Sequence, residues 1–284
     1  MMRNPLSKKI TGIEPSGIRK FFDLVSEMND KDVISLGVGE PDFDTPWHVR
    51  EEGIYSLEKG RTFYTGNSGL LELREEIGRY LDRRFGLSYS ADEILVTVGG
   101  SEAIDIGFRT MLDPGDEVII PEPCYVSYLP CVKLAGGVPV RLPLEEKDQF
   151  KLTKEKLLSA ITDKTKILVL PFPNNPTGAI LNREELQIIA DIVKEHDLFV
   201  MSDEIYSELN YEGGHVSIAS IPGMRENHCD QRIFQILCYD RMASGICSRT
   251  KRDHETDVED PSVCDHVRAY YQPVCSDRGS PQRR

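Results

Sequence analysis

The chain has 284 residues and 39% of them are hydrophobic, which is enough to bury one large core or a large and a small domain. Its formal net charge of -13 argues against nucleic acid or an anionic membrane surface as a partner, because such binding needs clustered Lys and Arg. No apolar run approaches the length of a membrane span and the first residues lack the apolar stretch of a secretory signal, so we expect a cytoplasmic protein that acts on small molecules.

Strand and helix patterns alternate along the chain as far as Glu226, which predicts a mostly parallel sheet covered by helices, in a three-layer α/β/α fold. The first strong pattern is an amphipathic helix from Gly69 to Phe85, with Leu73, Ile77 and Tyr80 on its inner face. Short strands are predicted at residues 94–97, 117–120, 138–140, 166–170 and 198–201.

Two local signals mark boundaries between these elements. The run from Asp113 to Asp116 predicts a turn, because Pro114 presets one backbone dihedral and Gly115 accepts a positive φ. Asn182 is followed three residues later by Glu185, which resembles a capping box and fixes the start of a helix. The apolar positions of that helix recur at three and four residues and share one face, at Leu186, Ile189, Ala190 and Val193.

Composition changes abruptly near Glu226. Residues 227–284 contain five of the seven cysteines, a single leucine (Leu237) and a single lysine (Lys251). Their nine basic and nine acidic residues cancel, so the whole acidic excess belongs to residues 1–226. With so few apolar side chains to bury, residues 227–284 are predicted to be disordered or loosely packed.

In open α/β sheets ligands collect beyond the carboxyl ends of the strands, and four such segments carry unusual chemistry. After the strand at 94–97, Gly99, Gly100 and Ser101 form a glycine turn that opens into a helix beginning near Ala103. Backbone N–H groups and the helix dipole favour a phosphate there, and the Ser101 hydroxyl adds a donor. The structural alternative is an ordinary strand-to-helix turn, since no G-x-G-x-x-G fingerprint is present.

The segment after the strand at 117–120 places Tyr125 at a predicted helix start on the same sheet edge. Its ring could stack on a flat heteroaromatic ring, or it could simply pack at the start of the helix. The neighbouring Cys124 and Cys131 are expected to be plain buried thiols.

Polar side chains follow the last two strands. Asn175 lies in a loop stiffened by Pro173 and Pro176, and a rigidly held amide can hydrogen-bond a phenolate oxygen. Asp203 ends an apolar run, where a carboxylate can keep the ring nitrogen of pyridoxal phosphate protonated, and Tyr206 can reach the same phenolic oxygen as Asn175. The structural alternatives are an Asn-Pro turn and a helix-capping aspartate.

Each segment alone has an ordinary explanation. Together, however, the segments provide a partner for each part of one cofactor, pyridoxal 5'-phosphate. Residues 1–226 also resemble the class I aminotransferases of fold type I, through these segments and through the strings at residues 34–43 and 64–69. The resemblance implies that residues 1–45 belong to a small domain that is largely missing. It also implies that residues 46–226 form an incomplete large, cofactor-binding domain, and that residues 227–284 are not homologous to the family.

The resemblance also implies a role for each site residue and a homodimeric unit that transfers an amino group from an amino acid to a 2-oxo acid. Gly39 would lie against the substrate carboxylate, and Tyr64 would reach the cofactor phosphate of a neighbouring subunit. In the same subunit, Gly100 and Ser101 would bind the phosphate and Tyr125 would stack on the ring. Asn175 and Tyr206 would contact the phenolic oxygen, and Asp203 would pair with the ring nitrogen.

The lysine that should hold the cofactor as a Schiff base is missing from this pattern. The family segment resembles Ser-Lys-x-x-x-x-x-Gly-x-Arg, whereas Lys251 is the only lysine beyond Asp203 and lies in a polar run with no strand before it. We therefore expect no Schiff-base lysine and an inactive chain of aminotransferase lineage. The alternative is a non-enzymatic product, which either binds pyridoxal phosphate without a covalent bond or has no activity.

A one-base slip of the reading frame near Glu226 or Asn227 explains the missing segment. Met242-Ala243 must be encoded ATG GCN, and a shift of one base turns this into TGG, tryptophan. Synonymous codons for residues 232–247 permit the shifted frame to spell GFSKSYAMTGWRLGY, which resembles the missing segment. The lysine codon would then straddle Gln235 and Ile236.

A metal-binding module is the alternative for residues 227–284. Zinc ligands usually come in pairs two to four residues apart, and the adjacent pair His228-Cys229 is the nearest approach to this spacing. We therefore favour the frame slip over a metal site, and over a disulfide framework in a chain expected to be cytoplasmic. The cysteines and histidines concerned are Cys229, Cys238, Cys247, Cys264, Cys275, His228, His254 and His266.

Sequencing the coding DNA tests the frame slip directly. We expect the shifted frame to stay open beyond codon 226 and to spell lysine across the codons of Gln235 and Ile236. An early stop codon, or another residue at that position, would show that the hypothesis is wrong.

Overall fold

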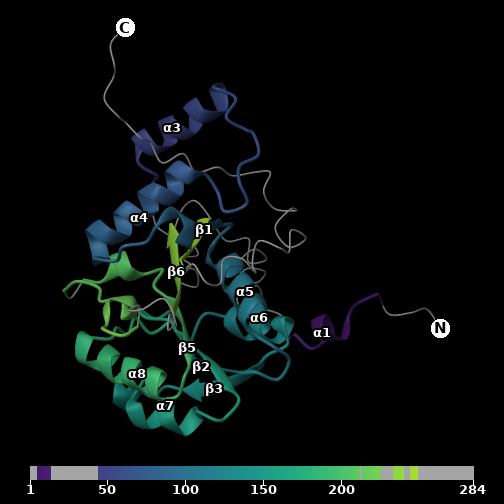
Figure 1. Ribbon diagram of the computed structural model, residues 1–284, viewed down its shortest axis with the longest axis vertical. Coiled ribbons are helices and arrows are strands. Elements are labelled where there is room, and N and C mark those ends of the chain that lie inside the picture. Colours follow the sequence, from purple (N-terminus) through teal and green to yellow (C-terminus); the bar gives the residue numbers. More distant parts are fainter. Residues whose placement is uncertain (1–4, 14–43, 212, 225–232, 240–243, 249–284) are drawn as a thin grey trace, which may run out of the picture.

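The computed structural model describes residues 5–13, 44–211, 213–224, 233–239 and 244–248 (Figure 1). Its centre is a seven-stranded sheet with the strand order β1-β7-β6-β5-β4-β2-β3. Neighbours from β6 to β3 pair in parallel, and β7 alone runs antiparallel, between β1 and β6. The strands are β1 Ile94–Thr97, β2 Glu117–Glu122, β3 Val138–Pro143, β4 Thr165–Leu170, β5 Phe199–Asp203, β6 Ile233–Tyr239 and β7 Ser244–Ser248.

Helices cover both faces of the sheet, which confirms the predicted three-layer α/β/α fold (Figure 1). Helices α5 and α6 pack against each other on one face, whereas α7 and α8 pack together on the other. The helices are α1 Lys8–Thr11, α3 Trp47–Glu58, α4 Leu71–Phe85, α5 Gly100–Met111, α6 Tyr128–Ala135, α7 Lys154–Ala160 and α8 Arg183–Glu195. Single 3-10 turns are η1 Ala91–Glu93, η2 Glu146–Asp148, η3 Ser207–Leu209 and η4 Ile218–Ser220.

Alternation along the central strands builds two hydrophobic cores. In β4, Ile167 and Val169 belong to the core under α5 and α6, whereas Leu168 and Leu170 belong to the core under α7 and α8. All four side chains are buried, and burying an aliphatic side chain of this size stabilises the fold by about 1.5–3 kcal/mol. This is why the predicted strands appear in the sequence as continuous apolar runs rather than as an alternation of apolar and polar residues.

The capping box predicted at Asn182 is confirmed. Asn182 Oδ1 accepts a hydrogen bond from the N–H of Glu185 at 2.9 Å, and the Glu185 carboxylate accepts one from the N–H of Asn182 at 2.8 Å. The pair satisfies two N–H groups that the first turn of a helix leaves without intrahelical partners. Helix α8 therefore begins at the predicted residue, with its apolar face on the core.

Three predicted helix starts differ from the structure. Helix α4 begins at Leu71 instead of Gly69, α5 at Gly100 instead of near Ala103, and α6 at Tyr128 instead of near Tyr125. At α5 the reason is local: Gly99 adopts φ 79°, which an L side chain rarely tolerates, and this turn lets the helix start immediately after it. The carboxylate of Glu102 then accepts a hydrogen bond from the N–H of Val98.

Within residues 227–284, which were predicted to be disordered or loosely packed, residues 233–239 and 244–248 form β6 and β7. Strand β6 extends the parallel sheet beyond β5, with Val200 opposite Ile233 and Asp203 opposite Ile236. The sequence of β6, IFQILCY, combines β-branched and aromatic residues, and pairing satisfies the N–H and C=O groups along the edge of β5. Residues 225–232, 240–243 and 249–284, with most of the cysteines and histidines of the metal alternative, lie outside the described residues.

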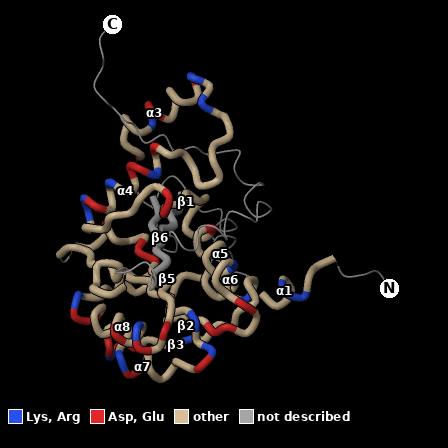
Figure 2. Tube along the Cα trace, in the orientation of Figure 1, with Lys and Arg blue, Asp and Glu red and all other residues tan. Residues whose placement is uncertain are grey.

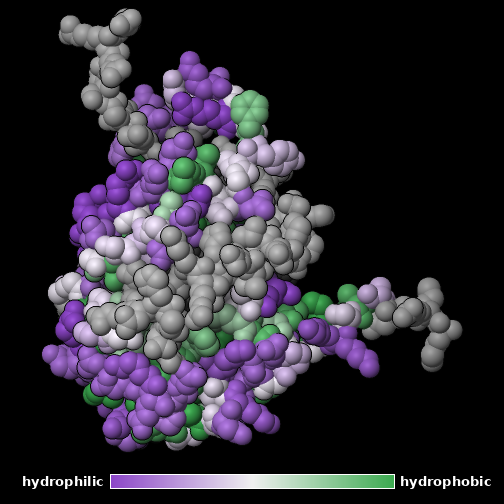
Figure 3. Space-filling view, in the orientation of Figure 1, coloured by the Kyte–Doolittle hydropathy of each residue, from purple (hydrophilic) through white to green (hydrophobic). Residues whose placement is uncertain are grey.

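Charged residues recur along α4, α7 and α8 (Figure 2), and the face seen in Figure 3 is largely hydrophilic over these helices. Helix α3 and the loop after it project at one end of the molecule and expose large apolar side chains, among them Trp47, Leu57 and Phe63. Within the described part of the chain, none of the helices combines the length and the apolar character that crossing a membrane requires.

Two glycine substitutions test the packing of α4. A Cβ added at Gly78 would lie 2.6 Å from the carbonyl oxygen of Tyr89, which is backbone and cannot rotate away. We expect Gly78→Ala to lower the free energy of unfolding by more than about 2 kcal/mol, although alanine is intrinsically the better helix former by about 1 kcal/mol. Urea unfolding followed by circular dichroism measures the difference.

The matched control is Gly53→Ala in α3, where an added Cβ would meet nothing within 4 Å. Helix propensity then acts alone, so this variant should be neutral or up to about 1 kcal/mol more stable. Equal effects of the two substitutions would contradict the close contact between α4 and Tyr89.

Candidate cofactor site

The parallel sheet brings the predicted site segments to one edge. The segments that follow β1, β2, β4 and β5 all leave the sheet at the carboxyl ends of these strands, where ligands of open α/β folds bind. Side-chain hydrogen bonds join them in pairs. The site is therefore assembled from four stretches that are far apart in the sequence.

The first pair joins the loop after β1 to the loop after β2. The hydroxyl oxygens of Ser101 and Tyr125 lie 3.1 Å apart, which is hydrogen-bond distance. Ser101 is the second residue of α5, so its hydroxyl lies beside the N-terminal N–H groups of that helix. Such a helix start attracts a phosphate, and Gly100 leaves room for a close approach to the backbone.

Asp203 is the last residue of β5 and its side chain is only 6% exposed. Its Oδ2 accepts a hydrogen bond of 2.6 Å from the hydroxyl of Tyr128 on α6, and its Oδ1 accepts one of 3.2 Å from the N–H of Ile205. Burial raises the pKa of the Asp203 carboxyl, while the two hydrogen bonds lower it. A buried carboxylate with acceptor capacity left over suits a cationic N–H group.

The third pair joins the loop after β4 to the segment after β5. Asn175 Nδ2 donates to the hydroxyl of Tyr206 at 3.3 Å, so the two predicted phenolate-binding groups are neighbours. The loop that carries Asn175 is held from within, because Asn174 Oδ1 accepts hydrogen bonds from the N–H of Thr177 at 3.2 Å and from its hydroxyl at 2.9 Å. The Nδ2 of Asn174 is buried and has no hydrogen-bond partner among the described residues.

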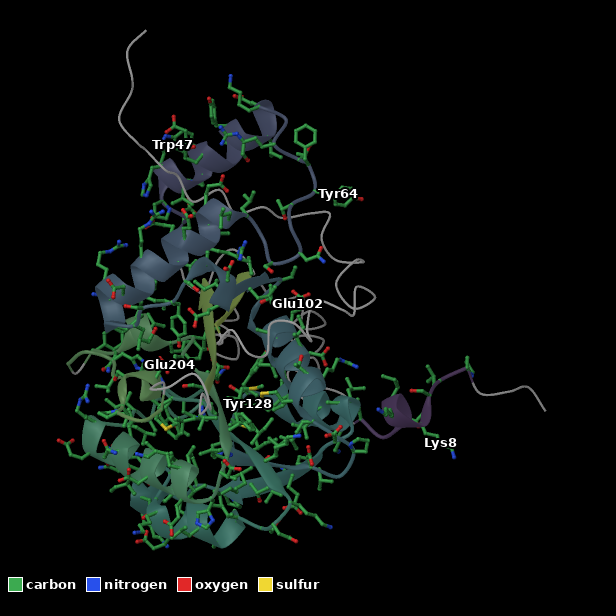
Figure 4. All side chains as sticks on the ribbon, viewed as in Figure 1. Lys8, Trp47, Tyr64, Glu102, Tyr128 and Glu204 are labelled. Carbon is green, nitrogen blue, oxygen red and sulfur yellow. The ribbon has the colours of Figure 1, made fainter. Side chains whose placement is uncertain are left out.

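Two predicted residues are not brought to this site. Tyr64 lies on the loop after α3, is 91% exposed and points away from Tyr128 and Glu204 (Figure 4). This position agrees with the role that the resemblance implies for Tyr64, at a site on another copy of the chain. Gly39, expected against the substrate carboxylate, lies outside the described residues.

The chemistry of this donor set fits pyridoxal phosphate. A helix N-terminus with a serine hydroxyl suits the phosphate, an amide and a phenol suit the phenolic oxygen, and a buried carboxylate suits a protonated ring nitrogen. The Ser101–Tyr125, Tyr128–Asp203 and Asn175–Tyr206 contacts show that these groups lie in one region of the sheet edge. Six of the eight predicted residues therefore belong to one arrangement.

Sequence reasoning missed Tyr128 and the residues around Glu204. Glu204 is 1% exposed and accepts hydrogen bonds from the hydroxyls of Ser202 and Ser217, both at 2.8 Å, while His215 Nε2 lies 2.7 Å from its Oε2. Because neighbouring residues of a strand face opposite sides, Asp203 points toward α6 and Glu204 toward the other core. The available signal was the pair of adjacent acids at the end of an apolar strand.

The two described cysteines beside the site are half-buried rather than fully buried as predicted. Burial raises the pKa of the Cys124 thiol to about 12 and that of Cys131 to about 11. Both thiols keep their protons at neutral pH, so neither is a nucleophile.

The chain was compared with known proteins. Residues 31–230 match the family described as aminotransferase class I and II. The chain is 54% identical over 226 residues to a putative aminotransferase, YugH, of Bacillus subtilis, covering 79% of this chain and 58% of that protein. It is 44% identical over 223 residues to aromatic-amino-acid aminotransferase 2 of Thermococcus litoralis, covering 78% of this chain and 57% of that protein.

A solved structure supports the same relationship. Aspartate aminotransferase from Thermus thermophilus, solved with maleate, has a TM-score of 0.82 and 36% identity, over 90% of this chain and 67% of that one. The chain thus spans little more than half the length of the curated relatives it matches.

The buried network around Glu204 can be tested without any ligand. In Glu204→Gln one carboxylate oxygen becomes an NH2 group and the negative charge is lost, so the hydrogen bonds with Ser202, Ser217 and His215 weaken or rearrange and we expect the free energy of unfolding to fall by about 2–3 kcal/mol. The measurement is urea unfolding at neutral pH. Glu195→Gln, at the exposed end of α8, is the control and should change stability by less than about 0.5 kcal/mol; similar losses in both variants would argue against the network.

Proposed function

Because the chain belongs to the class I and II aminotransferase family, whose enzymes depend on pyridoxal phosphate, we propose that its sheet edge is the cofactor pocket of an aminotransferase. The observation that carries the proposal is the buried carboxylate of Asp203 at the end of β5. An ionisable group is costly to bury, and a cationic partner offsets that cost. The ring nitrogen of pyridoxal phosphate is such a partner.

Each described site residue has a task in this proposal. Gly100 and Ser101 hold the phosphate at the start of α5, and Tyr125 stacks on the ring. Asn175 and Tyr206 donate to the phenolic oxygen and favour its ionised form, while Asp203 keeps the ring nitrogen protonated. When bound, pyridoxal phosphate withdraws electrons from the carbon that carries the amino group.

The proposed reaction moves an amino group from an amino acid to a 2-oxo acid. Relatives named as aspartate and aromatic-amino-acid aminotransferases support this class of substrate, and the particular donor is left open between them. We also propose a cytoplasmic homodimer, in which Tyr64 of one copy reaches the phosphate site of the other. Its exposure and its position far from the site within one chain support this arrangement.

We propose further that this chain is inactive as it stands, because it lacks the Schiff-base lysine. The family match ends at residue 230, close to the change in composition near Glu226. In the sheet, Ser202 lies opposite Gln235 and Asp203 opposite Ile236, the two residues whose codons the shifted lysine codon would straddle. The shifted frame would thus place its lysine on the strand next to Asp203, which supports a frame slip in a gene for an active enzyme.

A non-enzymatic product is the second candidate function. The absence of the lysine favours this candidate. The described groups proposed to bind the phosphate and the ring do not depend on that lysine. Such a chain would bind pyridoxal phosphate without forming a covalent bond.

Titration with pyridoxal phosphate followed by borohydride reduction and mass spectrometry separates the candidates. We expect saturable binding, no lysine that gains the mass of the cofactor, and binding about tenfold weaker in Asp203→Asn, because a hydrogen bond to a charged group contributes about 1.5–3 kcal/mol. A chain with the frame corrected by one base should trap the cofactor on one lysine.

Other results would contradict the proposal. If borohydride trapped the cofactor on one lysine of the present chain, the chain would have a Schiff-base lysine and the proposed cause of inactivity would be wrong. If the original chain and Asp203→Asn bound pyridoxal phosphate with equal affinity, the proposed pocket would not be the binding site.

A further inference from the structure

Tyr128 and Asp203 form a buried pair that bridges α6 and β5. Their exposed fractions are 1% and 6%, and the hydroxyl donates to Oδ2 of the carboxylate at 2.6 Å. Tyr128 is also among the largest fully buried side chains of the described residues. The hydroxyl does more than fill space, because it donates to the carboxyl group of a buried acidic residue.

We propose that Tyr128 is the positioning residue of the cofactor site, which fixes the Asp203 carboxylate in the orientation that holds a protonated ring nitrogen. The inference rests on the proposed function of this pocket. Tyr128 touches neither the substrate nor the cofactor in this proposal. It acts only through Asp203.

The hydrogen bonds at Asp203 define this orientation. Oδ2 accepts from Tyr128, and Oδ1 accepts from the N–H of Ile205 at 3.2 Å. The two donors come from different elements, so the carboxylate plane cannot rotate without losing one of them. A carboxylate has about four acceptor positions, which leaves room for an N–H group of the ring.

The surroundings of Tyr128 keep its hydroxyl a donor. It lies in the core with Phe108, Val132 and Met201, where burial raises its pKa well above the usual range, so the phenol stays protonated. Burial and the charge of the adjacent Glu204 raise the pKa of the Asp203 carboxyl. The hydrogen bond from Tyr128 opposes this and lowers the same pKa. The pKa of Asp203 is raised on balance, and the Tyr128 hydrogen bond makes that rise smaller than burial alone would produce.

Tyr128 also connects the two ends of the site. Its ring meets that of Tyr125 edge to face, with the centroids 6.0 Å apart and an interplanar angle of 83°. The hydroxyl of Tyr125 in turn lies 3.1 Å from that of Ser101 at the start of α5. Ser101, Tyr125, Tyr128 and Asp203 thus form one continuous set of contacts from the proposed phosphate end to the proposed ring-nitrogen end.

The test uses the full chain, Tyr128→Phe, and pyridoxamine 5'-phosphate, which needs no lysine to bind. We expect the variant to bind about tenfold more weakly, the loss that corresponds to one hydrogen bond to a charged group. The absorption band of the ring reports whether its nitrogen is protonated. Without the Tyr128 hydroxyl Asp203 becomes more basic and competes for that proton, so a larger fraction of the bound ring should be unprotonated at neutral pH.

Tyr89→Phe is the matched control, because Tyr89 is a buried tyrosine in the other core. It should leave the affinity and the absorption band unchanged, whatever it does to stability. A Tyr128→Phe variant that keeps both the affinity and the band of the original chain would overturn the positioning role.

A second measurement keeps this inference separate from the proposed function. Carbon-13 NMR of the Asp203 carboxyl, assigned with Asp203→Asn, follows its titration without any ligand. We expect the Asp203 pKa to be higher in Tyr128→Phe than in the original chain, and an unchanged pKa would refute the role of Tyr128. Failure of the original chain to bind pyridoxamine phosphate would refute the proposed pocket, and the NMR comparison would still decide the Tyr128–Asp203 coupling.

Discussion

The parallel alignment of β2, β4 and β5, with helices on both faces, is the constraint on which the site depends. Parallel strands end at the same edge, so segments separated by more than a hundred residues of sequence meet there. The strands themselves are too apolar to carry chemistry, because both of their faces are buried. The polar groups of the predicted site, at Ser101, Asn175 and Asp203, accordingly lie at or just after the carboxyl ends of the strands.

Two adjacent acids at the end of β5 show how the fold accommodates buried charge. Asp203 faces α6 and is held by Tyr128 and Ile205, whereas Glu204 faces the opposite core and is held by Ser202, Ser217 and His215. Leaving either carboxylate without partners would cost several kcal/mol. Glu204 thus has three side-chain partners and Asp203 has two hydrogen-bond donors. The proposed role of Asp203 depends on the acceptor capacity that this leaves.

The strand next to β5 connects the fold with the question of activity. Strand β6 completes the parallel part of the sheet with a sequence that lies beyond the family match, which ends at residue 230. Its apolar, β-branched residues are sufficient to pair with β5, because strand pairing is satisfied by the backbone. A lysine, in contrast, cannot be replaced by a residue that merely forms a strand. The sheet can therefore extend through this region whether or not the side chains of the strand carry any chemistry.

The sequence by itself determined the layer architecture, the positions of β1 to β5 and the start of α8, since these follow from local apolar patterns and from the Asn182–Glu185 pair. It also predicted six residues that the structure places at one edge of the sheet, because each of them follows a strand. It did not determine the starts of α5 and α6, which depend on the turn at Gly99 and on packing. The strand at 233–239 was missed because the prediction used the low apolar content of residues 227–284 as a whole. The apolar-rich run of seven residues within that stretch was not considered separately.

Only the tertiary structure decided which groups touch. Tyr128 and Asp203 are 75 residues apart, and no sequence pattern pairs a helix tyrosine with a carboxylate on the third strand that follows it in the chain. The same holds for Glu204 with Ser217 and for Ser101 with Tyr125. The physical reason is that periodicity fixes which face of an element is buried, whereas the partner on that face is set by how the helices and strands pack.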